Sequence, residues 1–265
     1  MLALITGEGA LPATLCRELP EPPLICVLDG FFPDGLKADI LFRIETLGSF
    51  LGTLKERGVT EVCFAGAIRR PPIDPAAIDA ATLPLVPILQ QALMSGDDGA
   101  LRAVVGIFEQ SGLTVRGAHQ IARSLLPPVG VPSAAQPDDG QRADARRGSA
   151  IVEAMAAVDV GQACVVRCGQ ALAVEGVYGT DWMLDSLRRR PEPREGGLLY
   201  KAPKPGQDRR VDLPMIGSAT PDSAAAAGLD GVVIEAGGVM VLDLPEVLAS
   251  CDRLGLFLWV RGPDG

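Results

Sequence analysis

Basic residues and a carboxylate are concentrated in the run Lys201–Pro214, which reads KAPKPGQDRRVDLP in an otherwise acidic chain. Pro203 and Pro205 favour a polyproline II path, which has three residues per turn. Lys201 and Lys204 are then expected to project from one face of this segment and to bind one anionic group together.

Asp212 follows the basic run, and Pro214 keeps Leu213 out of the helical region, so the carboxylate is expected on extended backbone. Hydrolysis of a diphosphate needs neutralised charge on the non-bridging oxygens and an aligned water, tasks that suit Lys, Arg, Mg²⁺ and a carboxylate. Asp212 is therefore the candidate catalytic residue, as a metal ligand or as the group that orients the water. A local salt bridge with Arg209 or Arg210 is the alternative.

His119 is the single histidine, which excludes multi-histidine zinc sites and two-histidine mechanisms. The six cysteines are scattered, and Cys164 and Cys168 have no second Cys or His pair to complete a zinc site. Their spacing predicts two small buried residues on one face of a strand. A metal that acts here would be held by oxygen ligands, which favours Mg²⁺ or Mn²⁺.

A glycine turn follows the first predicted strand, at residues 7–12 (GEGALP). Because it opens a helix, its backbone N–H groups, at Gly9 and Ala10, could receive a phosphate. Pro12 stands where the dinucleotide fingerprint has its third glycine, so a tight turn without a ligand is equally compatible.

A second small-residue turn, at residues 63–71 (CFAGAIRRP), also follows a predicted strand. Ligands gather beyond the carboxyl ends of strands in open α/β sheets. Gly66 is therefore expected near the ligand, and Arg69 or Arg70 is expected to clamp a phosphate unless both are ordinary surface arginines.

Four further candidates stand at predicted helix starts. One of Asp97 and Asp98 is expected to cap a helix, which leaves the other to orient a substrate hydroxyl or approach a cation. His119 opens another helix, as a substrate contact or as a structural hydrogen bonder. Thr180 is predicted to be an N-cap.

Glu175 and Asp181 lie on either side of that predicted cap, where a strand ends and a helix begins. Both are candidate substrate ligands if the strand end faces a cleft. A purely structural role is the alternative for each.

Composition restricts the classes of function. The chain has 265 residues, 48% hydrophobic, which suffices for one large or two ordinary domains. A net charge of -9 and an aromatic content of 4% argue against a nucleic-acid partner. The amino terminus does not resemble a secretory signal, and no apolar run is long enough to span a membrane.

The alternation of short apolar runs with helical periodicity predicts an α/β fold of two α/β domains joined by a Pro/Gly-rich linker, with a substrate cleft between the domains. We expect a Rossmann-like domain over residues 1–126, a linker over 127–144 and a catalytic domain over 145–265. Strands are predicted at 2–6, 24–28, 61–65, 113–116, 163–167, 171–175, 198–201, 231–235 and 256–260, and helices at 46–57, 83–94, 98–110, 145–157, from 181, and at 245–253.

The order and spacing of several segments over nearly the whole chain resemble the LpxI family of UDP-2,3-diacylglucosamine pyrophosphatases. These segments are GEGALP, CFAGAIRRP, GDDGALR, GAH, VEGVYGTDWML and KAPKPGQDRRVDLPMIG. The linker is long and proline-rich and the region after Arg188 is basic, departures that concern domain spacing rather than chemistry.

The resemblance implies a hydrolase of lipid A biosynthesis that depends on Mg²⁺. It would split a UDP-sugar lipid into UMP and lipid X at the cytoplasmic face of the inner membrane, as a peripheral protein without a nucleic-acid partner. The family's catalytic aspartate falls on Asp212, and water would attack the sugar-side phosphorus. A homodimer is compatible with this expectation.

Two other functions remain open at this point. A nucleotide-sugar or dinucleotide oxidoreductase would bind NAD(H) or NADP(H), although the phosphate fingerprint is incomplete. A non-catalytic protein that binds an anionic lipid or nucleotide would not release UMP.

Overall fold

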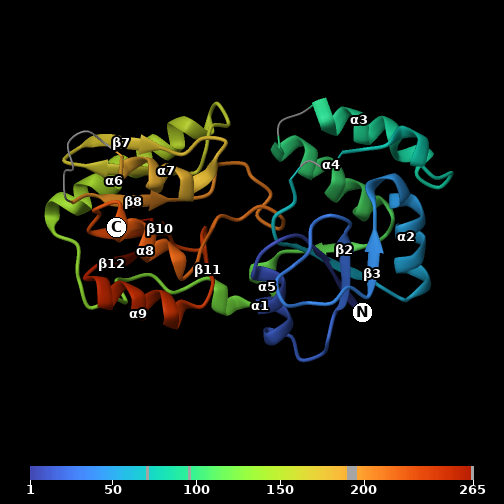
Figure 1. The fold of residues 1–265 in the computed structure, drawn as a ribbon, viewed down its shortest axis with the longest axis horizontal. Coiled ribbons are helices and arrows are strands. Elements are labelled where there is room, and N and C mark those ends of the chain that lie inside the picture. Colours follow the sequence, from blue (N-terminus) through green and yellow to red (C-terminus); the bar gives the residue numbers. More distant parts are fainter. Residues whose placement is uncertain (70–71, 95–96, 190–195, 264–265) are drawn as a thin grey trace. The chain divides into compact units, whose positions relative to one another are not determined.

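The structure is a computed structural model that describes residues 1–69, 72–94, 97–189 and 196–263 (Figure 1). The chain forms two compact units, which we describe separately. One contains Met1–Arg123 together with the short segment Asp208–Asp212, and the other contains Ser124–Gln207 and Leu213–Gly265.

The first unit is built on a five-stranded sheet in the order β3-β2-β1-β4-β5. Every neighbouring pair is parallel. The strands are β1 (Leu2–Thr6), β2 (Leu24–Leu28), β3 (Ile40–Phe42), β4 (Glu61–Ala65) and β5 (Thr114–Arg116). This order matches five of the six strands of a doubly wound nucleotide-binding sheet, whose order is 3-2-1-4-5-6.

Helices of the first unit follow its strands in α/β alternation. They are α1 (Leu11–Glu18), α2 (Leu47–Glu56), α3 (Val86–Met94), α4 (Asp97–Gln110) and α5 (Ala118–Ile121), with 3₁₀ turns η1 (Ile44–Thr46), η2 (Pro75–Ala77) and η3 (Leu83–Leu85). Phenylalanines join α2 and α4 to the sheet: the Phe42 and Phe50 rings stack at 4.0 Å, and Phe108 meets Phe64 edge to face at 5.1 Å. These contacts fix α4 against the sheet.

The second unit contains a mixed five-stranded sheet in the order β12-β10-β8-β6-β7. Its strands are β6 (Ala163–Arg167), β7 (Gln170–Val174), β8 (Leu198–Lys201), β10 (Gly231–Glu235) and β12 (Phe257–Arg261). The last three are mutually parallel, whereas β6 runs antiparallel to both β7 and β8. Two short strands of this unit, β9 (Met215–Ile216) and β11 (Met240–Val241), form a separate parallel pair.

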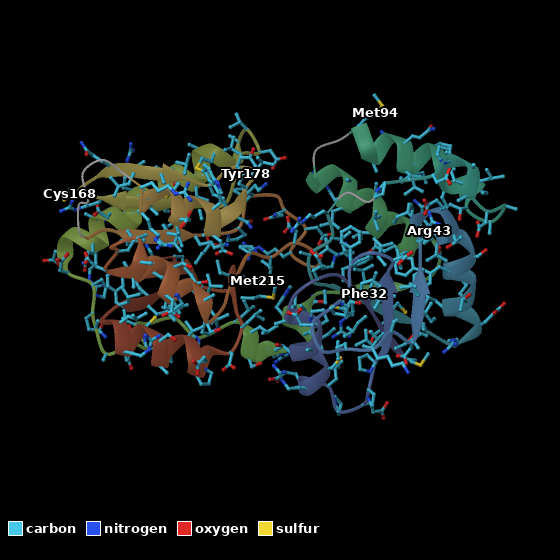
Figure 2. All side chains as sticks on the ribbon, in the orientation of Figure 1. Phe32, Arg43, Met94, Cys168, Tyr178 and Met215 are labelled. Atoms are coloured by element: carbon cyan, nitrogen blue, oxygen red, sulfur yellow. The ribbon has the colours of Figure 1, made fainter. Side chains whose placement is uncertain are left out.

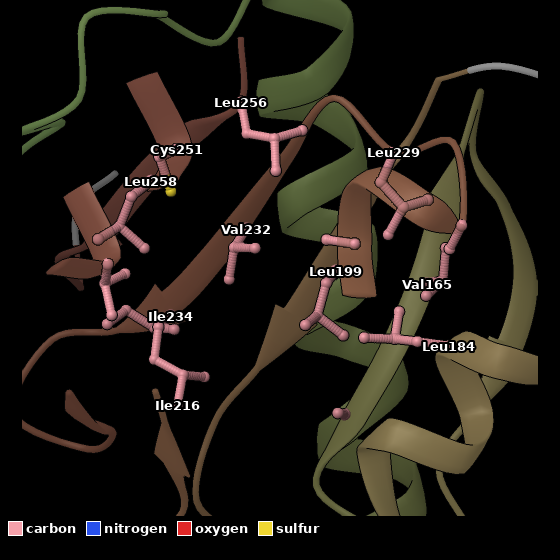
Figure 3. Close-up of a cluster of buried hydrophobic side chains, with 14 of the residues drawn as sticks. Val165, Leu184, Leu199, Ile216, Leu229, Val232, Ile234, Cys251, Leu256 and Leu258 are labelled. Atoms are coloured by element: carbon pink, nitrogen blue, oxygen red, sulfur yellow. The ribbon is translucent and has the colours of Figure 1, made fainter. Parts of the chain in front are cut away.

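Helices cover both faces of this second sheet. Leu199, Val232 and Leu258 share one core with α7 (Gly179–Leu187), α8 (Ala219–Ala226) and α9 (Leu244–Leu254) (Figure 3). Side chains that alternate with these along the strands pack on the other face against α6 (Asp139–Ala156). Burial on both faces explains why β6, β8, β10 and β12 are largely apolar runs that could be predicted from sequence, whereas β7 at the edge of the sheet is partly exposed.

Gly148 lies in the middle of α6, where glycine normally destabilises a helix. A Cβ at this position would come within 2.6 Å of the Tyr200 Cβ on β8. The glycine therefore allows α6 to lie close to the sheet.

The stretch expected as an exposed linker is partly built into the second unit. The Gly130 and Val260 backbones exchange hydrogen bonds of 3.0 and 2.8 Å, so this stretch pairs with β12 at the edge of the sheet. Ser133 is buried and its Oγ accepts from the Leu258 N–H at 2.8 Å. The helix predicted from residue 145 begins instead at Asp139, because Asp138 and Gln141 form a capping box.

Candidate functional site

Asp208–Asp212 forms a single turn that is held by backbone and side-chain hydrogen bonds within it. The N–H groups of Val211 and Asp212 both donate to the Asp208 carbonyl at 3.1 Å. Arg210 donates from Nε and Nη2 to the two carboxylate oxygens of Asp208, at 3.0 and 2.7 Å. This bidentate pair gives the turn a defined shape, and it holds the pKa of Asp208 below its usual range.

The same turn is fixed to the first unit. Arg210 Nη1 donates to Glu109 Oε1 on α4 at 2.6 Å, and Val211 packs on the hydrophobic core of that unit. A Cβ at Gly117 would come within 3.1 Å of the Arg210 Cα and within 2.6 Å of the His119 Cε1. Gly117 therefore gives room for the turn and the imidazole to approach the start of α5.

Asp212 is the last residue of this turn and is partly exposed. It precedes Leu213 and Pro214, which are buried in the second unit, so its carboxylate lies where the chain leaves the first unit. Arg210, one of the two arginines considered from sequence as a salt-bridge partner of Asp212, is bound to Asp208 and Glu109.

A cavity of about 550 Å³ adjoins the turn in the first unit. It is lined by Thr114, Val115, Arg116, His119, Gln120, Arg123 and Arg210. Arg116 also pairs with Glu61 at 2.7 Å, so one of these arginines is anchored from the sheet. Arg116 and Arg210 are already paired with carboxylates, so only part of this basic lining is available to an anionic group.

His119 contributes a neutral ring to this cavity. Burial, and secondarily the positive charge of Arg209, lower the pKa of His119 below 6.5, so the imidazole is uncharged at neutral pH. Its Nδ1 is buried and has no hydrogen-bond partner among the described residues. A buried nitrogen without a partner is costly, which favours the ligand role considered from sequence over that of a satisfied structural histidine.

The two glycine turns lie beside each other, because β1 and β4 are parallel neighbours. Glu8 and Ala67 exchange backbone hydrogen bonds of 2.9 Å, and a Cβ at Gly66 would come within 2.6 Å of the Gly7 carbonyl oxygen. The glycines at 7 and 66 are thus explained by the close approach of two loops.

Gly9 and Ala10 remain the candidates for phosphate binding in the first turn. Gly9 has a positive φ of 97°, and Ala10 is the N-cap of α1 without a side-chain hydrogen bond. Arg69 is highly exposed, and its Nη2 lies 4.0 Å from Glu8 Oε2. Arg70 lies outside the described residues, as do the side chains of Asp97 and Asp98 at the start of α4.

A buried polar network occupies the second unit. Lys201 Nζ donates to Thr180 Oγ1 at 2.8 Å, and Thr180 Oγ1 donates to Glu175 Oε1 at 2.7 Å. The other Glu175 oxygen accepts from the Gln162 N–H at 2.9 Å. Burial lowers the pKa of Lys201, while the charges of Glu175 and Asp181 oppose that shift.

This network corrects two sequence predictions. Thr180 is not the N-cap of α7, because the helix begins at Gly179 after Tyr178, and the hydroxyl serves the network instead. Lys201 does not lie on an exposed polyproline segment, because it is the last residue of β8 and is 7% exposed. Lys204 has a separate partner, Asp159.

The cysteines are free thiols, as predicted. Cys164 lies in β6 and is buried, but Cys168 is exposed at the β6–β7 turn with a φ of 49°, so the prediction of one shared strand face was wrong. Among the described residues, no three His, Cys, Asp or Glu side chains converge to hold a metal ion. Nor does the described part contain a helix that is long and apolar enough to cross a bilayer.

The sequence reasoning did not identify Asp208 and Glu109, which orient Arg210. The sequence could have indicated Asp208, since a carboxylate two residues before an arginine can close a turn. No local pattern indicates Glu109, because its partner Arg210 lies a hundred and one positions away.

Comparison with known proteins covers both units. The LpxI N-terminal domain matches residues 1–125 and the LpxI C-terminal domain matches residues 128–259. A protein of Caulobacter vibrioides (strain ATCC 19089 / CIP 103742 / CB 15) named UDP-2,3-diacylglucosamine pyrophosphatase LpxI is 38% identical over 270 residues, which cover 97% of this chain and 96% of that protein.

Proposed function

The chain belongs to the LpxI family, and from this premise we propose that it is a hydrolase that splits the diphosphate of UDP-2,3-diacylglucosamine. The products would be UMP and 2,3-diacylglucosamine 1-phosphate, lipid X, an intermediate of lipid A biosynthesis. The observation that carries the proposal is the similarity over both domains to a relative whose name states this activity. An oxidoreductase and a non-catalytic binding protein are not favoured by any of these similarities.

The turn that carries Asp212 supports a hydrolytic role for this carboxylate. Asp208 and Glu109 hold Arg210, and the turn is closed by backbone bonds to Asp208, so Asp212 projects from an ordered rather than a free segment. In the proposed reaction Asp212 orients or deprotonates the attacking water, and Arg210, bound to Asp208 and Glu109, keeps the turn that carries Asp212 in place. The bond that forms joins the water oxygen to the sugar-side phosphorus. The bond that breaks joins this phosphorus to the bridging oxygen, which leaves with UMP.

Mg²⁺ or Mn²⁺ is part of the proposal. The described residues do not build a cage of three ligands, but Mg²⁺ commonly binds one or two carboxylates together with substrate phosphate oxygens and water. Asp212 would be the protein ligand, and the ion would neutralise diphosphate charge. Both ions prefer oxygen ligands, which agrees with a chain that has a single histidine and dispersed thiols.

We further propose that His119, Gly9, Ala10, Gly66, Arg69, Asp97 and Asp98 contact the substrate. Glu175, Thr180 and Lys201 are better placed to shape the second unit than to touch substrate, because all three belong to one hydrogen-bonded network. The lipid substrate favours action at the cytoplasmic face of the inner membrane, by a peripheral protein that does not bind nucleic acid. A homodimer is compatible with this scheme.

The test is release of UMP from purified UDP-2,3-diacylglucosamine, followed by mass spectrometry in water enriched in ¹⁸O. We expect one labelled oxygen in the phosphate of lipid X and none in UMP. No release of UMP would refute the activity, whereas label in UMP would refute only the site of attack. NAD(H) or NADP(H) binding in a fluorescence titration would instead support the oxidoreductase.

A further inference from the structure

Three large apolar side chains are exposed together where α7 begins. Val177 is 93% exposed, Tyr178 is 73% exposed and Trp182 is 58% exposed. Figure 2 labels Tyr178. The Tyr178 and Trp182 ring centroids are 5.2 Å apart. We call these three residues the aromatic patch.

Tyr178 and Trp182 are far more exposed than the other tyrosine and tryptophan of this chain. Its other tyrosine and tryptophan, Tyr200 and Trp259, are 1% and 4% exposed. On α7 itself Met183, Leu184 and Leu187 are buried in the core, so the helix already has an inner face and Trp182 lies outside it. The aromatic patch is therefore surplus to the packing of this unit.

Charge at the aromatic patch is balanced. Asp185 pairs with Arg188 at 3.1 Å and with Arg189 at 3.2 Å, and Asp181 stands beside Trp182. The described part of this helix end thus carries two carboxylates and two guanidiniums. A partner that is recognised here would be selected by apolar and aromatic contact rather than by charge.

We propose that the aromatic patch inserts into the head-group region of a phospholipid bilayer. Tyrosine and tryptophan favour this environment, because one end of each ring is apolar and the other can meet water. The inference rests on the proposed function, since a substrate with two acyl chains has to be taken from a lipid phase. The net charge of -9 disfavours strongly anionic surfaces, so binding to zwitterionic vesicles is expected to persist at high salt.

Flotation of the full chain with phosphatidylcholine vesicles, without substrate, tests the proposal. We expect the double variant Tyr178→Ala/Trp182→Ala to lose about tenfold in vesicle partitioning, because the apolar area of two rings is no longer buried. Phe32→Ala is the matched control, since Phe32 is also 58% exposed but belongs to the other unit. It should float like the wild type.

Fluorescence adds an independent measurement. Lipids brominated near the head groups should quench Trp182 and spare the buried Trp259, so quenching should disappear in Trp182→Phe. Equal flotation of the wild type and the double variant, or quenching that survives in Trp182→Phe, would overturn the proposal. A double variant that changes from dimer to monomer without vesicles, while flotation is unaffected, would assign the aromatic patch to a second copy of the chain.

Turnover of detergent-dispersed UDP-2,3-diacylglucosamine separates this inference from the proposed function. The double variant should retain wild-type kcat there, because the aromatic patch meets the bilayer and not the diphosphate. A protein that floats as expected but releases no UMP would refute the function and leave the membrane contact in place.

Discussion

Arg210 binds Glu109 across a sequence separation of a hundred and one residues, with 2.6 Å between Nη1 and Oε1. The same guanidinium is bidentate with Asp208. Because Val211 also packs on the core of the first unit, a segment from the C-terminal half of the sequence completes the N-terminal unit. Asp212 is the residue that this arrangement presents.

A double-mutant cycle on Arg210 and Glu109 should detect this attachment. We expect Arg210→Gln and Glu109→Gln each to lower kcat clearly while changing the free energy of unfolding little. The coupling free energy of unfolding between the two residues should be only about 0.5–1 kcal/mol, because both groups are partly exposed. Arg253→Gln, which breaks the surface pair with Asp222, is the control. Changes in kcat that simply add would argue against a shared role.

The pH behaviour of His119 can be followed directly, because it is the single histidine. Burial and Arg209 lower its pKa, so its Hε1 resonance should titrate with a midpoint below 6.5 in the folded protein. As pH falls, His119 is therefore protonated in the unfolded chain before it is protonated in the folded protein. Its contribution to the free energy of unfolding is present above about pH 6.5 and is lost as pH falls through the pKa of the folded state. Arg209→Gln should raise the midpoint, and a midpoint above 6.5 in the wild type would contradict the burial that we describe.

The two lysines of the basic run should behave differently on substitution. Lys201→Ala leaves the Glu175 carboxylate buried without a nearby cation, and we expect a loss of about 2–4 kcal/mol in the free energy of unfolding. Lys204→Ala breaks a partly exposed pair with Asp159 and should cost about 0–1 kcal/mol. Urea unfolding measures both, and equal losses would mean that the network does not stabilise the second unit.

The parts of the fold that sequence predicted are those with a local signal. Residues 2–6, 24–28, 61–65, 163–167, 198–201 and 231–235 are mainly apolar and mainly buried, and the observed strands have these bounds. The small-residue helix α8 lacks such periodicity and was not predicted.

The candidate site was less accessible to sequence reasoning, because its geometry depends on distant partners. Two prolines near Lys201 suggested an extended exposed segment, yet residue 201 still belongs to β8, since it pairs with β6 and β10. Thr180 had the residue type of a helix cap, but the buried Glu175 and Lys201 take both hydrogen-bonding functions of its hydroxyl. Local propensity yielded to burial in both cases.

Metal dependence is expected to follow from oxygen ligands. Excess chelator should abolish UMP release. Mg²⁺ or Mn²⁺ should restore it better than Zn²⁺, because the free cysteines are dispersed and the chain has a single histidine. Thermal unfolding should change little on chelation, since no three-ligand site is present among the described residues. Full activity in excess chelator would remove the metal from the mechanism.

Asp212→Ala should lower kcat by at least about a hundredfold while the protein stays folded, as expected when a group that orients the water or holds the metal is lost. Its partly exposed position at the end of the turn means that the midpoint of thermal unfolding should shift little. Asp222→Ala, which also removes an exposed carboxylate but from the Arg253 pair on α8, is the matched control for stability. If Asp212 were only a surface ion-pair partner, its removal would cost about 0–1 kcal/mol of stability and little rate. Measuring kcat and the unfolding midpoint on the same preparations separates the two roles, and a near-normal kcat would leave Asp97, Asp98, Glu175 and Asp181 as the carboxylates to test next.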